Sequence, residues 1–178
     1  MSTKSRHVFK SDHACNWRSR IAAVLAAAAL VSLSTACAGE TRATGSALMG
    51  EPWGTNTVTP AALVTELARA SEADKPVVVC TGPAMLYRSG HVPGAVYHGP
   101  ASSSEGLADL TRWAKTLARE TNVVIYCGCC PVADCPNIRP AYKALKDVGV
   151  ARVRLLLLRT NFGTDWAEAG YPVEKATR

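Results

Sequence analysis

Residues 123–137 read VVIYCGCCPVADCPN, and this stretch decides both the expected fold and the expected site. The apolar, β-branched run from Val123 to Tyr126 is typical of a buried strand. The strand ends at Cys127, a loop with Gly and Pro follows, and a helical pattern opens at Asn137. A thiol between a strand end and a helix N-terminus meets backbone N–H groups and the positive end of a helix dipole, which favour the thiolate. We therefore predict that Cys127 is a nucleophile.

The residues around this stretch alternate short apolar runs with segments of helical periodicity. Apolar runs predict strands at 76–81, before Tyr97, at 123–127 and at 153–158, and helical spacing predicts helices at 60–70, 104–117 and 137–148. Thr59 and either Ser103 or Ser104 are expected to cap two of these helices at their N-termini, and Gly149 is expected to cap the third at its C-terminus.

Strands that alternate with helices predict an α/β fold in which helices cover both faces of a mainly parallel central sheet. In sheets of this kind the working site lies at the carboxyl ends of the strands. Cys80 and Cys127 both fall at such ends. We therefore expect the two cysteines at the same edge of the sheet.

The first 36 residues have the order of a secretory signal: a basic segment, an apolar run at 21–33, and small residues. The apolar run is too short for a bilayer span, which takes about 20 residues. Ser34–Cys37 resembles a bacterial lipobox, which would lipidate Cys37, and cleavage after Ala38 is the alternative. Both alternatives predict export to the bacterial periplasm or cell envelope, with a membrane anchor at Cys37 in the first.

The composition suggests three parts: a signal at 1–36, a flexible tether at 37–56 rich in Gly, Thr, Ser and Ala, and one domain at 57–178. Most of the net charge of +6 belongs to the signal, which holds five Lys or Arg residues and one Asp. Because the rest is close to neutral, the charge indicates neither a nucleic acid nor an acidic substrate as partner. We expect a monomer.

Two more stretches complete a set of three motifs. Tyr87–Ala95 reads YRSGHVPGA, Val124–Cys127 reads VIYC, and Asp165–Val173 reads DWAEAGYPV. The first resembles the aromatic-x-x-G-H-I-P-G-A signature of the rhodanese (sulfurtransferase) family. The second is similar to the strand that delivers the catalytic cysteine of that family, and the third to its closing W-x-x-A-G-x-P-V. Order and spacing agree, and the resemblance covers about 58–174.

The resemblance implies a rhodanese-like three-layer sandwich and an enzyme, a sulfurtransferase that works through a persulfide. Cys127 would take a sulfane sulfur from a donor, hold it among loop N–H groups that stabilise negative charge, and pass it to a thiol or other nucleophilic acceptor. The partner would be a small sulfane-sulfur donor or a protein thiol. Neither a cofactor nor a metal is expected.

The loop after Cys127 is longer than is usual for the family. It comprises Gly128, Cys129, Cys130, Pro131, Val132, Ala133, Asp134 and Cys135. Cys130 completes a C-x-x-C spacing and is the candidate resolving thiol. Cys135 could form a disulfide with Cys129 or Cys130. The sequence also departs from the family after the second strand, where Cys80-Thr81-Gly82 replaces the frequent Asp-x-Arg.

Three further residues have candidate roles near the site. Arg88 and Arg139 are possible anion-binding residues, with a solvated surface position as the alternative for each. His91 is expected to stabilise the turn by bonding backbone around Pro93-Gly94. A phosphatase is disfavoured, because the C-x5-R motif would require arginine where Ala133 stands.

Two other functions remain open. The first is an exported thiol–disulfide redox protein that uses Cys127 and Cys130. The second is a non-catalytic rhodanese-like module whose cysteine loop holds zinc or copper, since soft thiolates select such ions.

Overall fold

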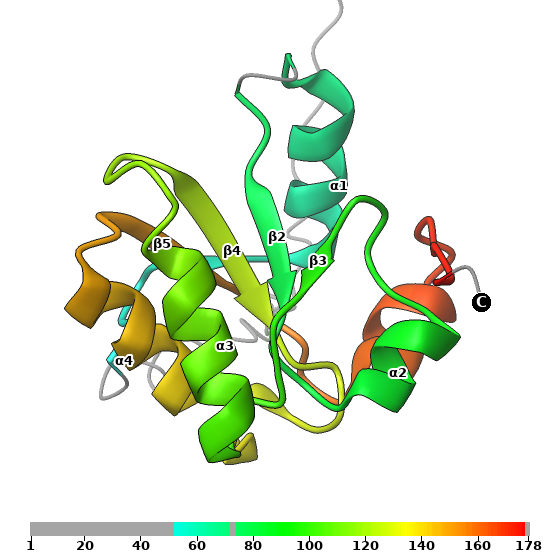
Figure 1. Cartoon of the computed structure of the whole chain (residues 1–178). Coiled ribbons are helices and arrows are strands. Elements are labelled where there is room, and N and C mark those ends of the chain that lie inside the picture. The colour runs from blue at the N-terminus through cyan, green and yellow to red at the C-terminus, as the bar shows by residue number, and fades with distance from the viewer. Residues whose placement is uncertain (1–51, 72–73, 177–178) are drawn as a thin grey trace, which may run out of the picture. The chain divides into compact units, whose positions relative to one another are not determined.

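Five parallel strands form the central sheet of the computed structural model, which describes residues 52–71 and 74–176 (Figure 1). They are β1 (Thr57–Val58), β2 (Val77–Cys80), β3 (Val96–Tyr97), β4 (Asn122–Tyr126) and β5 (Arg152–Leu156). Their order across the sheet is β1-β5-β4-β2-β3. Cys80 of β2 is aligned with Tyr126 of β4, so the two strands end at the same level. The predicted α/β fold with its parallel sheet is confirmed.

Helices cover both faces of the sheet. They are α1 (Pro60–Arg69), α2 (Ala84–Ser89), α3 (Ser104–Ala114) and α4 (Ile138–Val148), with a 3₁₀ turn η2 (Val132–Asp134) and a π-helical turn η3 (Gly163–Ala167). Successive side chains of β4 point to opposite faces. Val123 and Ile125 pack in one core cluster with α3 and α4, whereas Val124 and Tyr126 pack in a second cluster with α1 and η3. Burial on both faces explains why this strand is apolar throughout.

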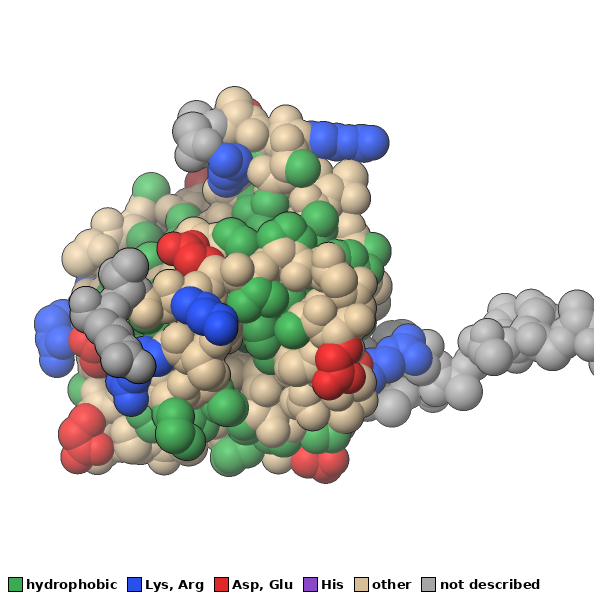
Figure 2. Space-filling model, turned by 90° about the vertical axis from the view of Figure 1, so that its right-hand side faces the viewer, with side chains coloured by type: hydrophobic (Ala, Val, Ile, Leu, Met, Phe, Trp, Pro, Cys, Tyr) green, Lys and Arg blue, Asp and Glu red, His purple; other side chains and the backbone are tan. Residues whose placement is uncertain are grey.

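The surface of the described residues mixes charged and apolar side chains. On the face at the right of Figure 1, hydrophobic side chains lie between separate Lys or Arg and Asp or Glu side chains (Figure 2). The large apolar side chains that are exposed are Met85, Leu86 and Val173, so they lie in α2 and in the C-terminal segment. Among the described residues, no helix combines the length and the apolarity that a membrane span requires.

The three predicted helix caps are present. Thr59 Oγ1 accepts a hydrogen bond of 3.3 Å from the backbone N–H of Ala62 at the start of α1. Ser103 does the same for α3, where its Oγ accepts from the backbone N–H of Gly106 at 3.0 Å. Gly149 ends α4 in the left-handed conformation, with φ at 100°.

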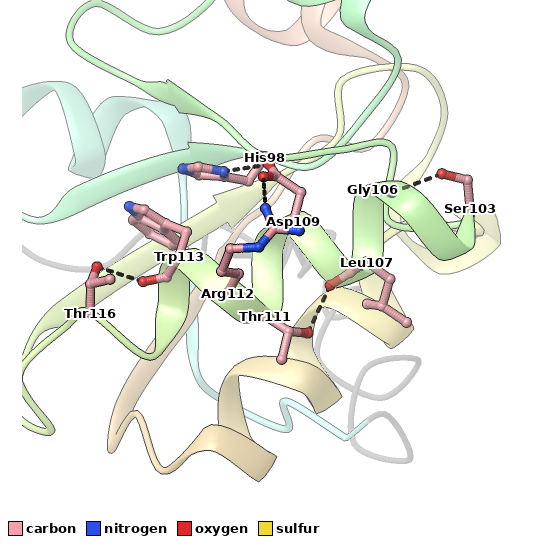
Figure 3. Close-up of polar contacts among 9 residues, drawn as sticks. All are labelled: His98, Ser103, Gly106, Leu107, Asp109, Thr111, Arg112, Trp113 and Thr116. Carbon is pink, nitrogen blue, oxygen red and sulfur yellow. Dashed lines mark hydrogen bonds and ion pairs between the residues drawn. The ribbon is translucent and has the colours of Figure 1, made fainter.

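His98 ties the segment after β3 to α3 (Figure 3). Its Nδ1 lies 2.8 Å from Asp109 Oδ2, and Arg112 Nη1 donates to Asp109 Oδ1 at 3.0 Å. The His98 ring also stacks on Trp113, with 4.6 Å between ring centroids. The hydrogen bond from His98 lowers the pKa of Asp109. This anchor fixes α3 beside the carboxyl end of the sheet.

The C-terminal segment returns to the turn before β3. The backbones of His91 and Glu174 exchange hydrogen bonds of 2.8 and 2.9 Å, and Gly94 donates its N–H to Glu174 Oε2 at 2.8 Å. The buried His91 ring uses Nδ1 to bond the Tyr87 carbonyl oxygen at 2.8 Å. His91 therefore fixes this turn as expected, but its partner is Tyr87 rather than the backbone around Pro93-Gly94.

Several elements differ from the expectations, among them the two-residue strand β1, which no apolar run predicted. Only a break was expected after Gly82, yet Pro83 stands at the N-cap of the short helix α2. Trp53 falls within the expected tether, yet it is fully buried and packs edge-on against Tyr142, with ring centroids 6.0 Å apart. The packed domain therefore includes Trp53 and begins before residue 57. The signal, Cys37 and the tether up to residue 51 lie outside the described residues.

Glu66 links α1 to two strands of the sheet. Arg154 of β5 donates to both carboxylate oxygens of Glu66, at 2.7 and 3.0 Å, and Asn122 Nδ2 donates at 3.3 Å. The hydrogen bonds from Arg154 lower the pKa of Glu66. The native state therefore binds this proton less tightly than the unfolded chain does, and the resulting stabilisation is lost as pH falls through the lowered pKa.

We expect Glu66→Gln to lower the free energy of unfolding by about 1–2 kcal/mol at pH 7, because the charge-assisted bonds to Arg154 are lost. The difference from wild type should shrink below about pH 4, where Glu66 is protonated in the unfolded chain. Urea unfolding at a series of pH values measures both. The control is Glu120→Gln. Glu120 is exposed and pairs with Arg119 at 3.8 Å, so this substitution should change the free energy of unfolding by less than about 0.5 kcal/mol. Equal losses in the two variants would contradict the prediction.

Candidate functional site

Cys127 lies directly after β4, at the carboxyl end of the sheet where the sequence predicts it. Its neighbour across the sheet is Gly82, which follows β2. A Cβ at position 82 would come within 2.3 Å of the Cys127 carbonyl oxygen and 2.8 Å of its Sγ. Cys80 Sγ also lies 3.8 Å from that carbonyl oxygen. Glycine at 82 therefore allows the two strand ends to meet at the cysteine.

Three more thiols of the loop gather around Cys127. Its Sγ lies 3.0 Å from the Sγ of Cys129, which lies 2.9 Å from the Sγ of Cys130. The sulfur atoms of Cys127, Cys129 and Cys135 all lie within 4.8 Å of one another. The five cysteines of the described residues are all free thiols, so Cys135 forms no disulfide. The C-x-C partner Cys129, rather than the C-x-x-C partner Cys130, makes the close contact with Cys127.

The backbone N–H groups at the helix N-terminus donate to Cys135. The Cys127 thiol donates a hydrogen bond to Cys135, and the backbone N–H groups of Asn137 and Ile138 donate to it as well, which together lower the pKa of Cys135 to about 5. The hydrogen bond with Cys135, together with burial, raises the pKa of Cys127. The expectation of a thiolate on Cys127 is therefore corrected. The long loop places Cys135, two residues before Asn137, at the start of α4.

Two other thiols, Cys80 and Cys130, are held in their neutral form. Burial raises the pKa of Cys80 to about 11. Burial and the hydrogen bond with Cys129 raise the pKa of Cys130. Hydrogen bonding thus favours the thiolate at Cys135, whose sulfur lies within 4.8 Å of the Cys127 sulfur.

Asn137 cross-links the site with both ends of its side chain. Its Nδ2 donates to Cys127 Sγ at 3.3 Å, and its Oδ1 accepts from the backbone N–H of Ser102 at 2.9 Å. The residue is only 3% exposed. Because a buried amide with both ends bonded has one orientation, Asn137 presents a fixed donor to the cysteine.

The other loop residues shape the walls around the thiols. Gly128 has φ at +81°, and a Cβ there would meet the Cβ of Phe162 at 2.9 Å. Pro131 leads into η2, whose buried Val132 donates its N–H to the Leu158 carbonyl oxygen at 3.2 Å. The loop is thus folded onto the end of β5 rather than projecting into solvent.

A cavity of about 550 Å³ opens beside Cys127. Among the residues that line it are Cys80, Tyr126, Cys127, Cys129, Phe162 and Lys175. Leu86 and Val173 also line it and are partly exposed, which gives part of its border an apolar character. The cavity therefore offers a small molecule a place beside Cys127.

The two candidate anion-binding arginines do not line this cavity. Arg139 donates to the Ala133 carbonyl oxygen at 3.1 Å and lies over the Trp53 ring, 5.8 Å from its centroid. Arg88 is exposed in the last turn of α2. A cation that does line the cavity is Lys175, in the C-terminal segment.

Sequence reasoning missed Gly82, Asn137 and Lys175 as parts of the site. Gly82 carried a usable signal, because a glycine directly after a central strand indicates close approach of another backbone. Asn137 was recognised only as the start of a helix, and its bond to Ser102 joins positions 35 residues apart. Lys175 lies beyond the last motif and carried no signal.

No protein-family model matches the chain, and no curated protein matches it. Among solved structures, the BH2092 protein from Bacillus halodurans matches with a TM-score of 0.51 at 22% identity, over 67% of this chain and 76% of that one. The rhodanese-like domain of the Alr3790 protein from Anabaena sp. matches with a TM-score of 0.50 at 18% identity, over 68% and 80% of the two chains.

A third match is the thiosulfate sulfurtransferase from Pseudomonas aeruginosa, with a TM-score of 0.50 and 21% identity. It covers 68% of this chain but 19% of that larger one. Likeness at these identities is a likeness of fold. Together with the five-stranded parallel sheet and the cysteine at the end of β4, it establishes that the described domain has the rhodanese-like fold.

Proposed function

We propose that this protein is a sulfurtransferase that carries a sulfane sulfur as a persulfide on Cys127. One observation carries the proposal: the Cys127 thiol stands at the carboxyl end of β4 and lines a cavity of about 550 Å³. Asn137 Nδ2 and the backbone N–H of Cys129 donate to its sulfur. Such donors stabilise negative charge on a thiolate or persulfide. The rhodanese-like fold supports the proposal at the level of architecture.

The chemistry needs two displacements at sulfur. In the first, the Cys127 sulfur attacks the outer sulfur of a sulfane donor such as thiosulfate, the donor S–S bond breaks, and sulfite leaves with the electron pair. In the second, an acceptor thiolate attacks the outer persulfide sulfur, and Cys127 leaves as the thiolate. As its sulfur attacks, Cys127 passes its proton to the thiolate of Cys135, to which it is hydrogen-bonded.

The cavity suits an anionic donor that reaches the sulfur from one side. We assign Lys175 the role of attracting this donor, in place of Arg88 and Arg139. The acceptor is a small thiol or a protein thiol. We also propose that the protein is exported to the cell envelope and carries a lipid on Cys37. The support for this is the signal-like order of the first 36 residues.

Incubation of the reduced protein with thiosulfate should add the mass of one sulfur atom per chain in intact mass spectrometry. Cys127→Ser should abolish the adduct, because the sulfur that accepts it is gone. Cys80→Ser is the matched control, since Cys80 lines the same cavity and should leave loading unchanged. Cys130→Ser should also retain the adduct. An adduct that persists in Cys127→Ser would move the nucleophile to another thiol of the loop.

Asn137→Asp tests the donor to the sulfur. The new carboxylate can still accept from the Ser102 N–H but can no longer donate to Cys127, so sulfur loading should slow by about tenfold or more. Stopped reactions followed by mass spectrometry give the rate. Thermal unfolding checks the fold, and Asn137→Ala provides the comparison in which both bonds are lost. Unchanged loading in Asn137→Asp would rule out a positioning role.

A second candidate function is thiol–disulfide exchange. The observation in its favour is the separation of 3.0 Å between the sulfur atoms of Cys127 and Cys129. With oxidised glutathione, a Cys127–glutathione disulfide would form and release one glutathione thiol. Cys129 would then attack the Cys127 sulfur and release the second, which leaves a Cys127–Cys129 bond.

Peptide mapping after this oxidation should find the bond between Cys127 and Cys129, and not the C-x-x-C bond to Cys130. Cys130→Ser should lose two thiols per chain on oxidation, as wild type does. In Cys129→Ser, oxidation should stop at the glutathione adduct on Cys127. A bond between Cys127 and Cys130 in the wild type would contradict the contact geometry.

A further inference from the structure

The sulfur atoms of Cys127, Cys129 and Cys135 form a cluster that sulfur transfer does not use as a whole. All three lie within 4.8 Å of one another, with Cys127 and Cys135 buried and Cys129 half-buried. A persulfide carrier needs one nucleophilic sulfur. Three thiols that converge from one loop are instead a donor set for a soft metal ion.

We propose that Cys127, Cys129 and Cys135 together bind one thiophilic ion, Cu(I), each through its thiolate sulfur. A thiolate binds a first-row d¹⁰ ion at about 2.3 Å, so three sulfurs around one ion lie about 4.0 Å apart. In the structure no two of these three sulfur atoms are more than 4.8 Å apart, which is close to the spacing that one such ion requires. Cys129 must move away from Cys127 by about 1 Å, which its half-exposed position after Gly128 permits.

The number of thiolate ligands favours Cu(I) over zinc. A structural zinc site takes four protein ligands. Cys130 contacts Cys129 at 2.9 Å but is not a member of the three-thiol group, and Cys80 points to the Cys127 carbonyl oxygen. Soft thiolates select Cu(I), and a three-thiolate set is complete for that ion.

The surroundings already compensate the charge that such a site carries. Three thiolates around a single positive charge leave the site negative. Asn137 Nδ2 donates to the Cys127 sulfur at 3.3 Å, and the N–H groups of Asn137 and Ile138 donate to Cys135. Hydrogen bonds of this kind orient metal ligands and stabilise their charge. The positive end of α4 adds to the effect.

This site goes beyond the proposed sulfur transfer and does not depend on it. Both use Cys127, so a bound ion would occupy the sulfur that accepts the persulfide. Metal occupancy would therefore switch off sulfur loading at the same loop.

The test is an anaerobic titration of the reduced full chain with Cu(I) in competition with bathocuproine disulfonate. Wild type should withdraw one Cu(I) per chain from the chelator. Cys129→Ser and Cys135→Ser should each weaken binding by at least about tenfold, because each removes a ligand. Cys80→Ser and Cys130→Ser are the matched controls and should keep the affinity of wild type. X-ray absorption of the loaded protein should show a shell of three sulfur atoms.

Equal affinity in wild type and Cys129→Ser would overturn the proposal. So would a loss in Cys130→Ser as large as that in Cys129→Ser, which would indicate a four-thiol site. If circular dichroism shows that Cys135→Ser is unfolded, Cys129→Ser decides alone, because its side chain is half-exposed. No sulfur donor is present in the titration. A negative result there leaves the persulfide proposal standing, and a failed thiosulfate assay leaves this one standing.

Discussion

The close approach of Gly82 to Cys127 is the contact on which the rest of the site depends. β2 and β4 run parallel in register, so the chain after each strand leaves the sheet at the same level. Any side chain at 82 would occupy the space of the Cys127 carbonyl oxygen and sulfur. The sheet therefore determines where the sulfur lies, and the loop determines only what surrounds it.

Four of the five strands and the three main helices were accessible from the sequence because their signals are local. The run at 123–126 is apolar at every position since both its faces are buried, and the caps at Thr59, Ser103 and Gly149 act within one turn. Other features had no such signal, among them the two-residue strand β1. The short helix α2 buries none of its residues, and Trp53 reaches the core through a segment whose composition is that of a tether.

The site was predictable in its position and less so in its electrostatics. Cys127 follows its strand as the pattern indicates, but the helix N–H groups reach Cys135, because the long loop inserts a second cysteine in front of α4. Similarly, the C-x-x-C spacing pointed to Cys130, while the loop geometry brings Cys129 to 3.0 Å from Cys127. Sequence spacing measures distance along the chain, and a loop that turns at Gly128 does not preserve it.

The pairing of Glu174 with His91 has a practical consequence for anyone who expresses this protein. The last described residues close onto the turn before β3 and bring Val173 and Lys175 to the cavity wall. A shortened version that stopped at Pro172 would strip that wall and leave two backbone groups of His91 without their partners. An affinity tag fused after Lys175 therefore needs a spacer long enough to keep residues 173–175 in contact with the turn and the cavity.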